Sequence, residues 1–514
     1  MYARLSSASV VGISAFLVEV ETHLEQQLPG FAVVGLPDSA VRESRERVVA
    51  AIKSSGFAFP QRKITVNLAP ADIRKEGSGF DLPIAIGILA ASGMIGQEAL
   101  DGVLIIGELA LDGTLRPIHG ALSIAIEASA RGMRRMIVPR ANAEEAALAG
   151  AVEVLAADSL AEVVSILTGE LAPEPVQVDS QALFERYQSH HQPDFADVKG
   201  QEAVKRALEV AAAGGHNVIM IGPPGSGKTM LARRLPSILP PLSLAEALET
   251  TRIHSVAGIL PPGQPLVTER PFRAPHHTIS DAALVGGGMS TIRAGEISLA
   301  HHGVLFLDEL PEFARNVLEV LRQPLEERRI TISRTKMTVE YPCNVMLVCS
   351  MNPCPCGNFG NPKHECTCTP QQIQRYLAKI SGPLLDRIDI HIEVQPVDHR
   401  ELSAARRGEP SAVIRERVVA ARQRQRERFR SADGIYKNAD MGSKQLEQFC
   451  ALDAQGRALL DAAMQRLGLS ARAYDRILKV ARTIADLDGS DAISPVHIGE
   501  AIQYRSLDRQ FWNV

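Results

Sequence analysis

Residues 217–235, NVIMIGPPGSGKTMLARRL, decide the fold of this chain. They read as an apolar strand, a glycine-rich turn and the start of a helix, and the turn matches the pattern G-x-x-x-x-G-K-[ST]. In such a turn the glycines let backbone N–H groups point at phosphates, and the helix N-terminus adds its partial positive charge. The pattern and its strand-to-helix context predict an ATP site. The predicted nucleotide-binding residues are Gly222, Pro223, Pro224, Gly225, Ser226, Gly227, Lys228 and Thr229.

Four side chains near this turn are predicted to act on the phosphates, the metal ion and the attacking water. Lys228 reaches the β- and γ-phosphates, and the Thr229 hydroxyl ligates Mg²⁺. Downstream, GVLFLDE (303–309) is an apolar strand that ends in two acids. Asp308 is expected to hold Mg²⁺, directly or through water, and Glu309 to polarise the attacking water. Alone, such a string is commonly a buried strand with solvated acids, but its pairing with the P-loop favours the catalytic interpretation.

Three further polar residues are candidates for the same chemistry. Asn352 follows the next apolar strand, where an amide can hold the attacking water. Arg387 lies in GPLLDRIDI (382–390), where the alternative role is a salt bridge on a helix surface. Arg472 lies near the start of a predicted helix over residues 469–487. The predicted catalytic residues are therefore Glu309, Asn352, Arg387 and Arg472.

Size and composition indicate a soluble protein of several domains. The chain has 514 residues, a hydrophobic content of 45%, a charged content of 22% and a formal net charge of −4. This balance excludes a uniformly basic surface but not a local basic channel. The N-terminus does not have the pattern of a signal peptide, and the longest apolar run, about residues 82–96, is too short to cross a bilayer. We therefore expect a cytoplasmic protein without membrane contact.

The pattern along the chain predicts an α/β protein of three parts. Residues 1–171 alternate strand-like runs with amphipathic helices, including a helix that begins after Asp38 or Ser39 and stops at Gly56. Residues 172–193 carry three prolines and little periodicity, which indicates a linker. Residues 194–395 are a second α/β unit, and residues 396–514 are helical. The further predicted strands of the first part are residues 64–70, 103–110 and 134–139.

The helical part contains a strongly basic run. Residues 415–430, RERVVAARQRQRERFR, hold seven arginines and two glutamates. A solvated helix face is the favoured interpretation, and a DNA-contacting patch is the alternative.

A short loop collects most of the thiols. Residues 352–368, NPCPCGNFGNPKHECTC, contain four of the seven cysteines as two Cys-x-Cys pairs. In a reducing compartment, clustered cysteines favour metal binding over disulfides, and four sulfurs suit structural Zn²⁺. His364 is a candidate replacement for one sulfur, and a redox role or simple packing remain alternatives. The predicted metal ligands in this insert, residues 353–369, are Cys354, Cys356, Cys366 and Cys368, in addition to Thr229 and Asp308 for Mg²⁺.

Two histidine doublets, His276-His277 and His301-His302, invite a metal interpretation. Adjacent residues on a strand point to opposite faces, so a doublet is a poor chelate. A structural or loop role is favoured.

The nucleotide-site motifs, in this order, resemble those of the AAA+ ATPases. The resemblance implies a P-loop core with a parallel sheet and a helical lid. It also implies that Asn352 is sensor 1, Arg387 an arginine finger that acts on a neighbouring subunit, and Arg472 sensor 2 on the lid. Fingers supplied in trans imply a ring, which in this class is usually a hexamer.

Two segments resemble features of the magnesium-chelatase and replicative-helicase branch of that class. Residues 261–288 resemble its helix-2 insert. Residues 328–342, RRITISRTKMTVEYP, alternate like a hairpin and resemble the pre-sensor-1 hairpin that lines the ring pore. Arg334 and Lys336 would lie at its tip, either as ordinary polar tip residues or as pore contacts.

The first domain resembles the proteolytic domain of the Lon family over residues 66–89 and 107–139. That family needs a serine nucleophile and a lysine base. Alignment of the motifs places Gly79 where the serine belongs and Leu122 where the lysine belongs. Ser78 is adjacent but needs a register shift, and without a base to activate the hydroxyl covalent catalysis is not credible. The resemblance implies a protease-dead scaffold, and DNA binding by this scaffold is left open.

Taken together, the three parts resemble the ComM/YifB family of magnesium-chelatase-like proteins. The motifs PGFAVVGLPDSAVRESRERV, APHHT and SMNPCPCG carry this resemblance, which covers nearly the whole chain. The resemblance implies an ATP-driven hexameric motor, or helicase, that promotes branch migration when transforming DNA recombines during natural competence. The implied partners are branched, single- or double-stranded DNA and other copies of the chain, with recombination proteins as further candidates.

Other functions remain as alternatives at this point. One is a magnesium-chelatase-type motor that remodels a protein partner. A Lon-like protease is disfavoured by Gly79 and Leu122. A non-enzymatic ATP-gated scaffold is disfavoured by the intact set of Lys228, Glu309, Asn352 and Arg387.

Overall fold

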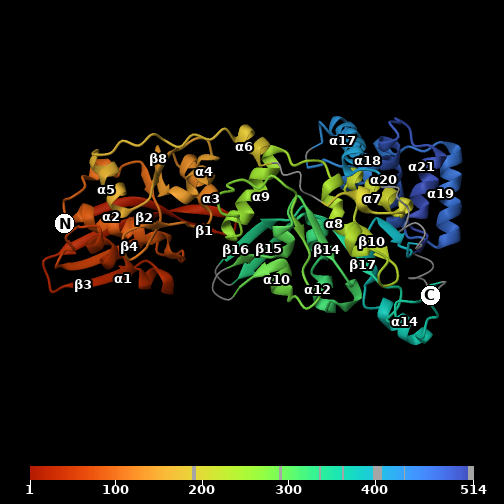
Figure 1. Cartoon of the computed structure of the whole chain (residues 1–514), viewed down its shortest axis with the longest axis horizontal. Helices are drawn as coiled ribbons and strands as arrows, with labels where there is room; N and C mark the ends of the chain where they lie inside the picture. The colour runs from red at the N-terminus through yellow and green to blue at the C-terminus, as the bar shows by residue number, and fades with distance from the viewer. Residues whose placement is uncertain are drawn as a thin grey trace.

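The structure, a computed structural model, describes residues 1–187, 193–288, 292–334, 337–361, 364–397, 408–432 and 434–507. The chain is elongated, with the first domain at one end, the P-loop core in the middle and the helical lid at the other end (Figure 1).

The first domain is built on a seven-stranded mixed sheet in the order β3-β4-β2-β1-β5-β8-β9. The pairs β1-β2 and β2-β4 are antiparallel, and the other neighbours are parallel. The strands are β1 Tyr2–Val11, β2 Ser14–Glu25, β3 Gly30–Val34, β4 Lys63–Ala69, β5 Val103–Ile105, β8 Arg135–Pro139 and β9 Glu153–Ala157. The helices are α1 Ser39–Ser54, α2 Asp81–Ala91, α3 Ala121–Ala130, α4 Arg140–Ala147 and α5 Leu160–Thr168.

Local sequence signals explain the first of these helices. α1 begins after Asp38, whose carboxylate accepts the N–H of Val41 at 2.8 Å, and Gly56 follows its end with a φ of 84°. Both ends agree with the prediction. The predicted strand 103–110 instead divides into β5 and a short hairpin, β6 Glu108–Leu109 with β7 Leu115–Arg116. The division occurs where Gly107 gives its N–H to Gly79 and accepts the N–H of Leu82, so the chain leaves the sheet to meet α2.

The predicted linker is partly ordered. Within residues 172–193 the chain forms α6 (Ser180–Arg186), which is capped by Asp179. Phe184 on α6 is buried in a small cluster with Leu122 of the first domain and Leu242 of the core. The segment predicted as a linker therefore contains a short helix that packs between the two domains. The helix was not predicted because it has less than two turns and only one buried aromatic side chain, which is too short a segment to show periodicity. Residues 188–192 lie outside the described part.

The P-loop core holds a five-stranded parallel sheet in the order β11-β14-β17-β10-β18. Parallel strands bring their carboxyl ends to one edge, where ligands of open α/β sheets bind. The predicted hairpin forms from β15 and β16, but its tip, residues 335–336, lies outside the described residues. The strands are β10 Val218–Ile221, β11 Phe272–Arg273, β14 Val304–Leu307, β15 Arg329–Arg334, β16 Met337–Pro342, β17 Met346–Met351 and β18 Ile390–Glu393, with a small pair β12 Gly286–Gly287 and β13 Arg293–Ala294.

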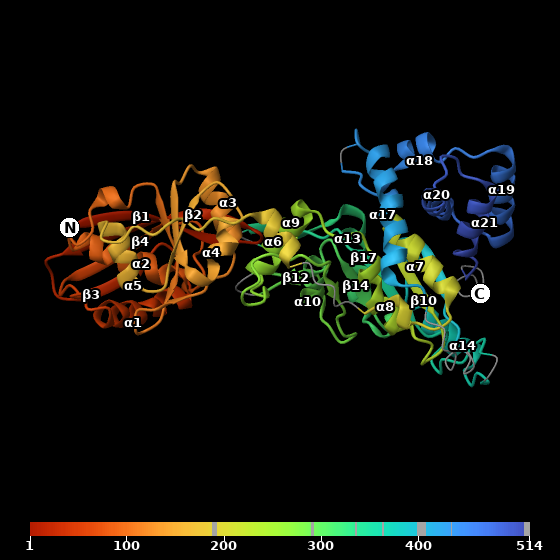
Figure 2. The same ribbon diagram turned by 45° about the horizontal axis from the view of Figure 1, so that its top comes forward.

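Helices cover both faces of this sheet. The helices of the core are α7 Glu202–Gly214, α8 Lys228–Ile238, α9 Leu244–Val256, α10 Asp281–Val285, α11 Glu296–Leu299, α12 Arg315–Glu319, α13 Arg322–Glu327, α14 Pro370–Leu377 and α15 Gly382–Leu385. The lid consists of α17 Ser411–Arg428, α18 Ser443–Phe449, α19 Ala454–Leu467, α20 Ala471–Leu487 and α21 Pro495–Gln503, and it shows no strand among its described residues. The lid packs on α7 and α8, so core and lid share one hydrophobic cluster (Figure 2).

The basic run of α17 serves this packing. Arg422 donates to the carbonyls of Ala212 and Ala213 at the end of α7, and Arg428 forms an ion pair with the fully buried Asp486 of α20. Arg417 pairs with Glu209 and Glu409, and Arg424 pairs with Asp491. Arg417 and Arg422 thus join the lid to the core, whereas Arg424 and Arg428 pair within the lid. For Arg422 and Arg428 both expectations, a solvated face and a DNA patch, are wrong, because their guanidinium groups are engaged inside the protein.

The first domain meets the core through α9. The Ser255 hydroxyl of α9 donates to Glu145 of α4 and accepts the N–H of Gly120 at 2.9 Å. Arg252 donates to the carbonyl of Ile13 in the β1–β2 turn at 3.1 Å. A Cβ at Gly12 in the same turn would lie 2.2 Å from Val339 of β16. The first domain therefore contacts the hairpin directly.

Candidate nucleotide and metal sites

The P-loop lies between β10 and α8, as predicted. Lys228 is the first residue of α8 and is only 9% exposed. Its ammonium donates to the carbonyls of Gly222 (2.7 Å) and Pro223 (2.9 Å) and to the side-chain oxygen of Asn352 (3.2 Å). Gly227 has a φ of 89°, which a residue with a side chain rarely adopts and which turns the loop into the helix. The lysine is thus held beside the space that phosphates occupy in such loops.

The predicted magnesium residues come together from two elements. The Thr229 hydroxyl of α8 donates to Oδ2 of Asp308 at 2.7 Å, and Asp308 lies directly after β14. Asp308 also accepts the Ser350 hydroxyl of β17 and, at 3.0 Å, the N–H of Glu309. A hydroxyl and a carboxylate oxygen in contact are the hard oxygen donors that Mg²⁺ takes from proteins in nucleotide sites. The donor set therefore fits a magnesium–nucleotide complex.

Glu309 is presented as an acid at the edge of the site. Its φ of 53° lies in the left-handed region, and its side chain is 58% exposed. His277 Nδ1 lies 3.7 Å from Glu309 Oε2. The sequence analysis assigned this histidine a structural or loop role. His277 lies beside the candidate catalytic acid, so the APHHT motif that contains it borders the site.

Burial and nearby acids act in opposite directions on Lys228. Burial lowers the pKa of the Lys228 ammonium to about 8, and the charges of Asp308 and Glu309 work against that decrease. A bound polyphosphate would add negative charge at this point and raise the pKa.

The two predicted arginines lie together, away from this P-loop. Arg387 is nearly buried, and its guanidinium pairs with Glu326 and donates to the carbonyl of Pro383. The neighbouring Asp386 pairs with Arg472 of α20 at 3.2 Å. Among the described residues, no hydrogen bond or ion pair links either arginine to the P-loop. The structure thus places the predicted finger and sensor 2 next to each other where the end of α15 meets α20, with Arg387 buried and Arg472 exposed.

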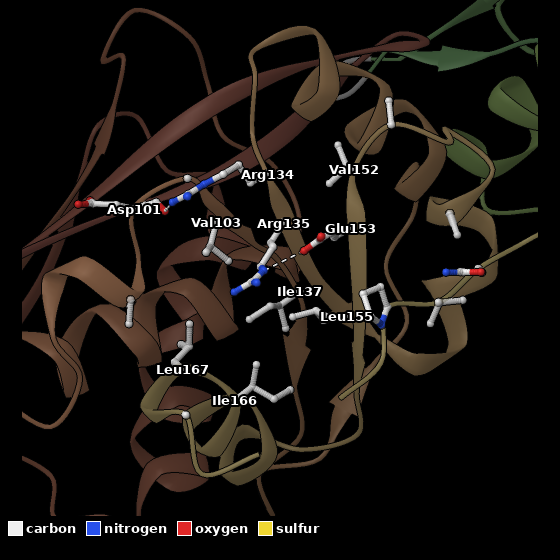
Figure 3. Close-up of a pocket in the computed structure, with 18 of the residues that line it drawn as sticks. Asp101, Val103, Arg134, Arg135, Ile137, Val152, Glu153, Leu155, Ile166 and Leu167 are labelled. Carbon is white, nitrogen blue, oxygen red and sulfur yellow. Dashed lines mark hydrogen bonds and ion pairs between the residues drawn. The ribbon is translucent and has the colours of Figure 1, made fainter. Parts of the chain in front are cut away.

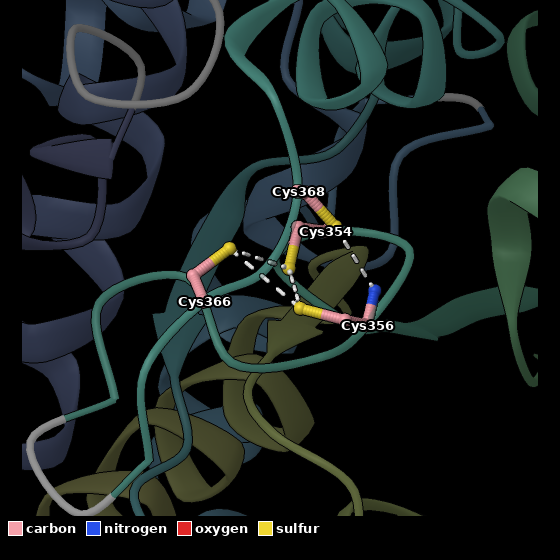
Figure 4. Close-up of side chains that lie close together, drawn as sticks. All are labelled: Cys354, Cys356, Cys366 and Cys368. Carbon is pink, nitrogen blue, oxygen red and sulfur yellow. Dashed lines mark hydrogen bonds between the residues drawn. The ribbon is translucent and has the colours of Figure 1, made fainter.

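The cysteine loop forms the second site (Figure 4). The ligand atoms of its four cysteines all lie within 4.8 Å of one another. Cys354 Sγ is 3.3 Å from Cys356 Sγ and 3.7 Å from Cys366 Sγ, and Cys356 and Cys366 are 3.6 Å apart. All four cysteines are free rather than in disulfides, and His364 is exposed and outside this group.

A third cluster joins Glu249 with His301 and His302. His301 Nδ1 accepts the N–H of Asn344, so in the neutral ring Nε2 carries the proton and donates it to Glu249. To bind a metal through Nε2, His301 would need a lone pair on that nitrogen, but Nε2 carries the proton. At metal sites the ring nitrogen that does not bind the metal is usually the hydrogen-bond donor. His302 Nε2 also contacts Glu249, at 2.8 Å. This arrangement ties α9 to the base of β14 and agrees with the structural role predicted for the doublet.

The first domain places its lysine and serine in separate environments. Lys75 is fully buried and donates to the carbonyls of Pro70 and Ile73. Ser78 donates to Glu108, and Leu122 lies buried on α3. Gly79, where the predicted alignment puts the serine, packs against Ile106.

A cavity of about 1180 Å³ also belongs to the first domain (Figure 3). It is an open groove between β8, β9 and the segment 175–178, far from the P-loop in sequence and structure. Arg135 in its wall is paired with Glu153, and Arg134 donates to the carbonyl of Asp101. A cavity of this volume could hold a small ligand, but its two arginines are already engaged.

Two contacts at these sites were not predicted from the sequence. Ser350 lies two residues before Asn352 and buries its hydroxyl against Asp308, and Gly357 of the cysteine loop lies against Pro224 of the P-loop. No helix that the structure describes is both long and apolar enough to span a bilayer.

Comparison with known proteins places these sites in a family. The family profile described as magnesium chelatase, subunit ChlI, matches residues 194–402, a second ChlI profile matches residues 20–142, and the ChlI C-terminal profile matches residues 408–505. The chain is 47% identical to YifB of Escherichia coli, over 98% of this chain and 96% of that protein. It is 45% identical to the competence protein ComM of Haemophilus influenzae, over 99% and 97%.

A more distant relative is the magnesium-chelatase 67 kDa subunit of Heliobacterium mobile, 24% identical over 62% of this chain and 47% of that protein. The full-length matches and the matching profiles together show that the chain belongs to the ComM/YifB family of magnesium-chelatase-like AAA+ proteins.

Proposed function

We propose that this protein is an ATP-driven hexameric motor that moves branched DNA and promotes branch migration of recombination intermediates during natural transformation. The observation that carries the proposal is the meeting of Lys228, Thr229, Asp308 and Asn352 at one edge of the parallel sheet. The full-length similarity to a competence protein supports the choice of DNA over other substrates of such motors.

In this proposal the P-loop binds the polyphosphate and the neighbouring side chains prepare hydrolysis. Lys228 gives up its loop carbonyls and donates to the phosphates. Thr229 and Asp308 would hold Mg²⁺, which supplies positive charge at the phosphates when bound. The Glu309 carboxylate is accessible and can take a proton from the attacking water, and the side-chain amide of Asn352 orients that water. The proposed cofactors are ATP, Mg²⁺ and a structural Zn²⁺ on the cysteine loop.

The arginine pair supports a ring. Within the described residues Arg387 pairs with Glu326 and Arg472 with Asp386 rather than with the P-loop, so we take their phosphate partner to belong to another copy of the chain. In a closed ring each copy would offer this surface to the next nucleotide site. Arg387 would exchange its pairing with Glu326 for the γ-phosphate, the transition-state contact that arginine fingers supply.

DNA contact is proposed at the hairpin of β15 and β16. Arg334 and Lys336 would bind phosphates in the pore without regard to sequence, which makes binding salt-sensitive. Movement of the hairpin would be transmitted to the first domain, because the β1–β2 turn of that domain lies against Val339.

The first domain is proposed to be a Lon-like scaffold without protease activity. The Lys75 ammonium donates to two backbone carbonyls, and the Ser78 hydroxyl donates to the carboxylate of Glu108. A serine nucleophile needs a neighbouring base of suitable pKa, and the lysine that serves this purpose in Lon proteases is replaced by Leu122.

A second candidate function is a chelatase-type motor that remodels a protein partner. The ChlI profiles and the similarity to a magnesium-chelatase subunit favour it. Turnover of ATP by the purified protein with and without four-way DNA distinguishes the two, with Lys228→Ala as the inactive control. The DNA motor predicts stimulation by the junction, whereas an absence of both DNA binding and stimulation would overturn it.

A further inference from the structure

The cysteine loop connects two parts of the nucleotide site. It begins after Asn352 at the end of β17 and ends where Thr369 caps α14. Asn352 accepts a hydrogen bond from Lys228 at 3.2 Å. The shape of this loop therefore bears on the residues that would meet the γ-phosphate.

The sulfurs are arranged as a metal would hold them. Tetrahedral Zn²⁺ with bonds of about 2.3 Å separates its sulfur ligands by roughly 3.8 Å. The three sulfur pairs within contact distance are separated by 3.3 to 3.7 Å. Four thiolates so close together would repel one another, and a cation between them removes that repulsion.

The backbone also favours thiolates. The N–H of Cys356 points at Cys368 Sγ at 3.4 Å, and the N–H of Phe359 points at Cys354 Sγ at 3.3 Å. Such donors stabilise negative sulfur and orient the ligands, as surrounding groups do at metal sites. Simple packing of small residues requires neither the donors nor the convergence.

The loop also presses directly on the P-loop. A Cβ at Gly357 would lie 2.5 Å from Cδ of Pro224, so the ring of Pro224 lies as close to the Gly357 backbone as a glycine allows. Gly357 has a φ of 81° and lies directly after Cys356. The position of Pro224 is therefore coupled to the fold of the segment that carries the first two sulfurs.

We propose that one Zn²⁺ bound by Cys354, Cys356, Cys366 and Cys368 braces the P-loop through the Gly357–Pro224 contact, so that metal occupancy sets the affinity for ATP. Four protein ligands leave no open position, so the ion has a structural role and carries out no chemistry. Removal of the metal frees the loop, Pro224 loses its support, and the phosphate-binding turn loses its shape. The proposal rests on the ATP site proposed above.

Metal content is the first test. Protein purified under reducing conditions, with zinc supplied and without chelators, should contain one zinc per chain by elemental analysis. Cys366→Ser with Cys368→Ser should lose it, whereas Cys450→Ala, which removes a buried thiol of the lid, should keep it. Less than stoichiometric zinc in the unaltered protein overturns the metal site.

Nucleotide affinity is the second test, with a fluorescent ATP analogue and Mg²⁺. Chelation of the wild-type protein should weaken binding about tenfold or more, and Zn²⁺ added back should restore it. This reversible arm does not depend on whether the cysteine variants fold. Unchanged affinity after verified loss of zinc would overturn the coupling, whereas failure of zinc-loaded wild type to bind ATP would overturn the proposed function instead.

A pair of glycine variants separates the contact from the metal. Gly357→Ala puts a methyl group into Pro224, while Gly360→Ala imposes a similar backbone strain (φ 77°) with nothing within 4 Å. Both should retain zinc, and only Gly357→Ala should weaken ATP binding. Equal ATP affinities of the two variants would contradict the proposal that the cysteine loop supports Pro224 through Gly357.

Discussion

The protein contains two buried lysines that look alike locally and differ in their surroundings. Lys75 in the first domain and Lys228 in the core each donate to two backbone carbonyls of the loop that precedes them. Burial lowers the pKa of both ammonium groups. Lys228 is also bonded to Asn352 and lies near Asp308, whereas Lys75 is fully buried and its bonds hold a turn.

This difference shows that the neighbours of a lysine, rather than the lysine itself, make a site. The core brings polar side chains from three parallel strands to one edge, so Lys228 has partners that can exchange for phosphates. In the first domain Gly79 and Leu122 stand where the Lon-like resemblance would place a serine and a lysine, and Lys75 donates to the carbonyls of its own loop.

The largest expected effect separates the two lysines. Lys228→Ala should reduce kcat/KM for ATP about 1000-fold, because the cation beside the phosphates is lost. Steady-state ATPase measurements, with DNA present, check it.

The matched control is Lys75→Met. It should leave turnover unchanged and lower the free energy of unfolding by about 1–3 kcal/mol, because buried carbonyls lose their donor. Thermal unfolding measures this loss. Similar turnover defects in both variants would break the comparison.

Loss of the acid should affect chemistry more than binding. Glu309→Gln is expected to lower kcat about 100-fold while nucleotide affinity stays within about twofold, because a general base contributes to the transition state. Glu108→Gln, the acid beside Ser78, should change neither. A large loss of affinity in Glu309→Gln would argue that this side chain binds rather than activates.

The pH dependence of binding should report on Lys228. The pKa near 8 means that the ammonium of the free protein loses its proton above that pH, while bound polyphosphate favours the protonated form. ATP affinity should therefore be nearly constant below pH 8 and fall by up to about tenfold per pH unit above it. A Kd that does not change between pH 7 and pH 9.5 would contradict the environment described for this lysine.

The smallest expected effect is in the first domain. Ser78→Ala should alter neither ATP turnover nor the degradation of casein, which should be absent in both proteins. Casein cleavage that disappears in this variant would overturn the protease-dead scaffold.

Much of the core site could be predicted because its signals are local. The P-loop and the acids after β14 are short motifs whose strand context is visible in the sequence, and the structure places Thr229 and Asp308 in contact. Ser350 and His277 could not be assigned, because they join the site only when separate strands and loops converge.

The lid was harder to predict for a related reason. Periodicity identified its helices, but the partners of Arg422 and Arg428 come from α7 and α20, far away in sequence. The position of Arg472 beside Asp386 likewise depends on how the lid packs, and composition says nothing about that packing.

The most direct test of the DNA-motor account is strand movement itself. A labelled synthetic four-way junction, incubated with the zinc-loaded protein, ATP and Mg²⁺, should be converted to forked products. Conversion should stop with Glu309→Gln or without ATP, although the junction is still bound. If vigorous ATP turnover leaves the junction intact and unbound, the protein is not a branch-migration motor.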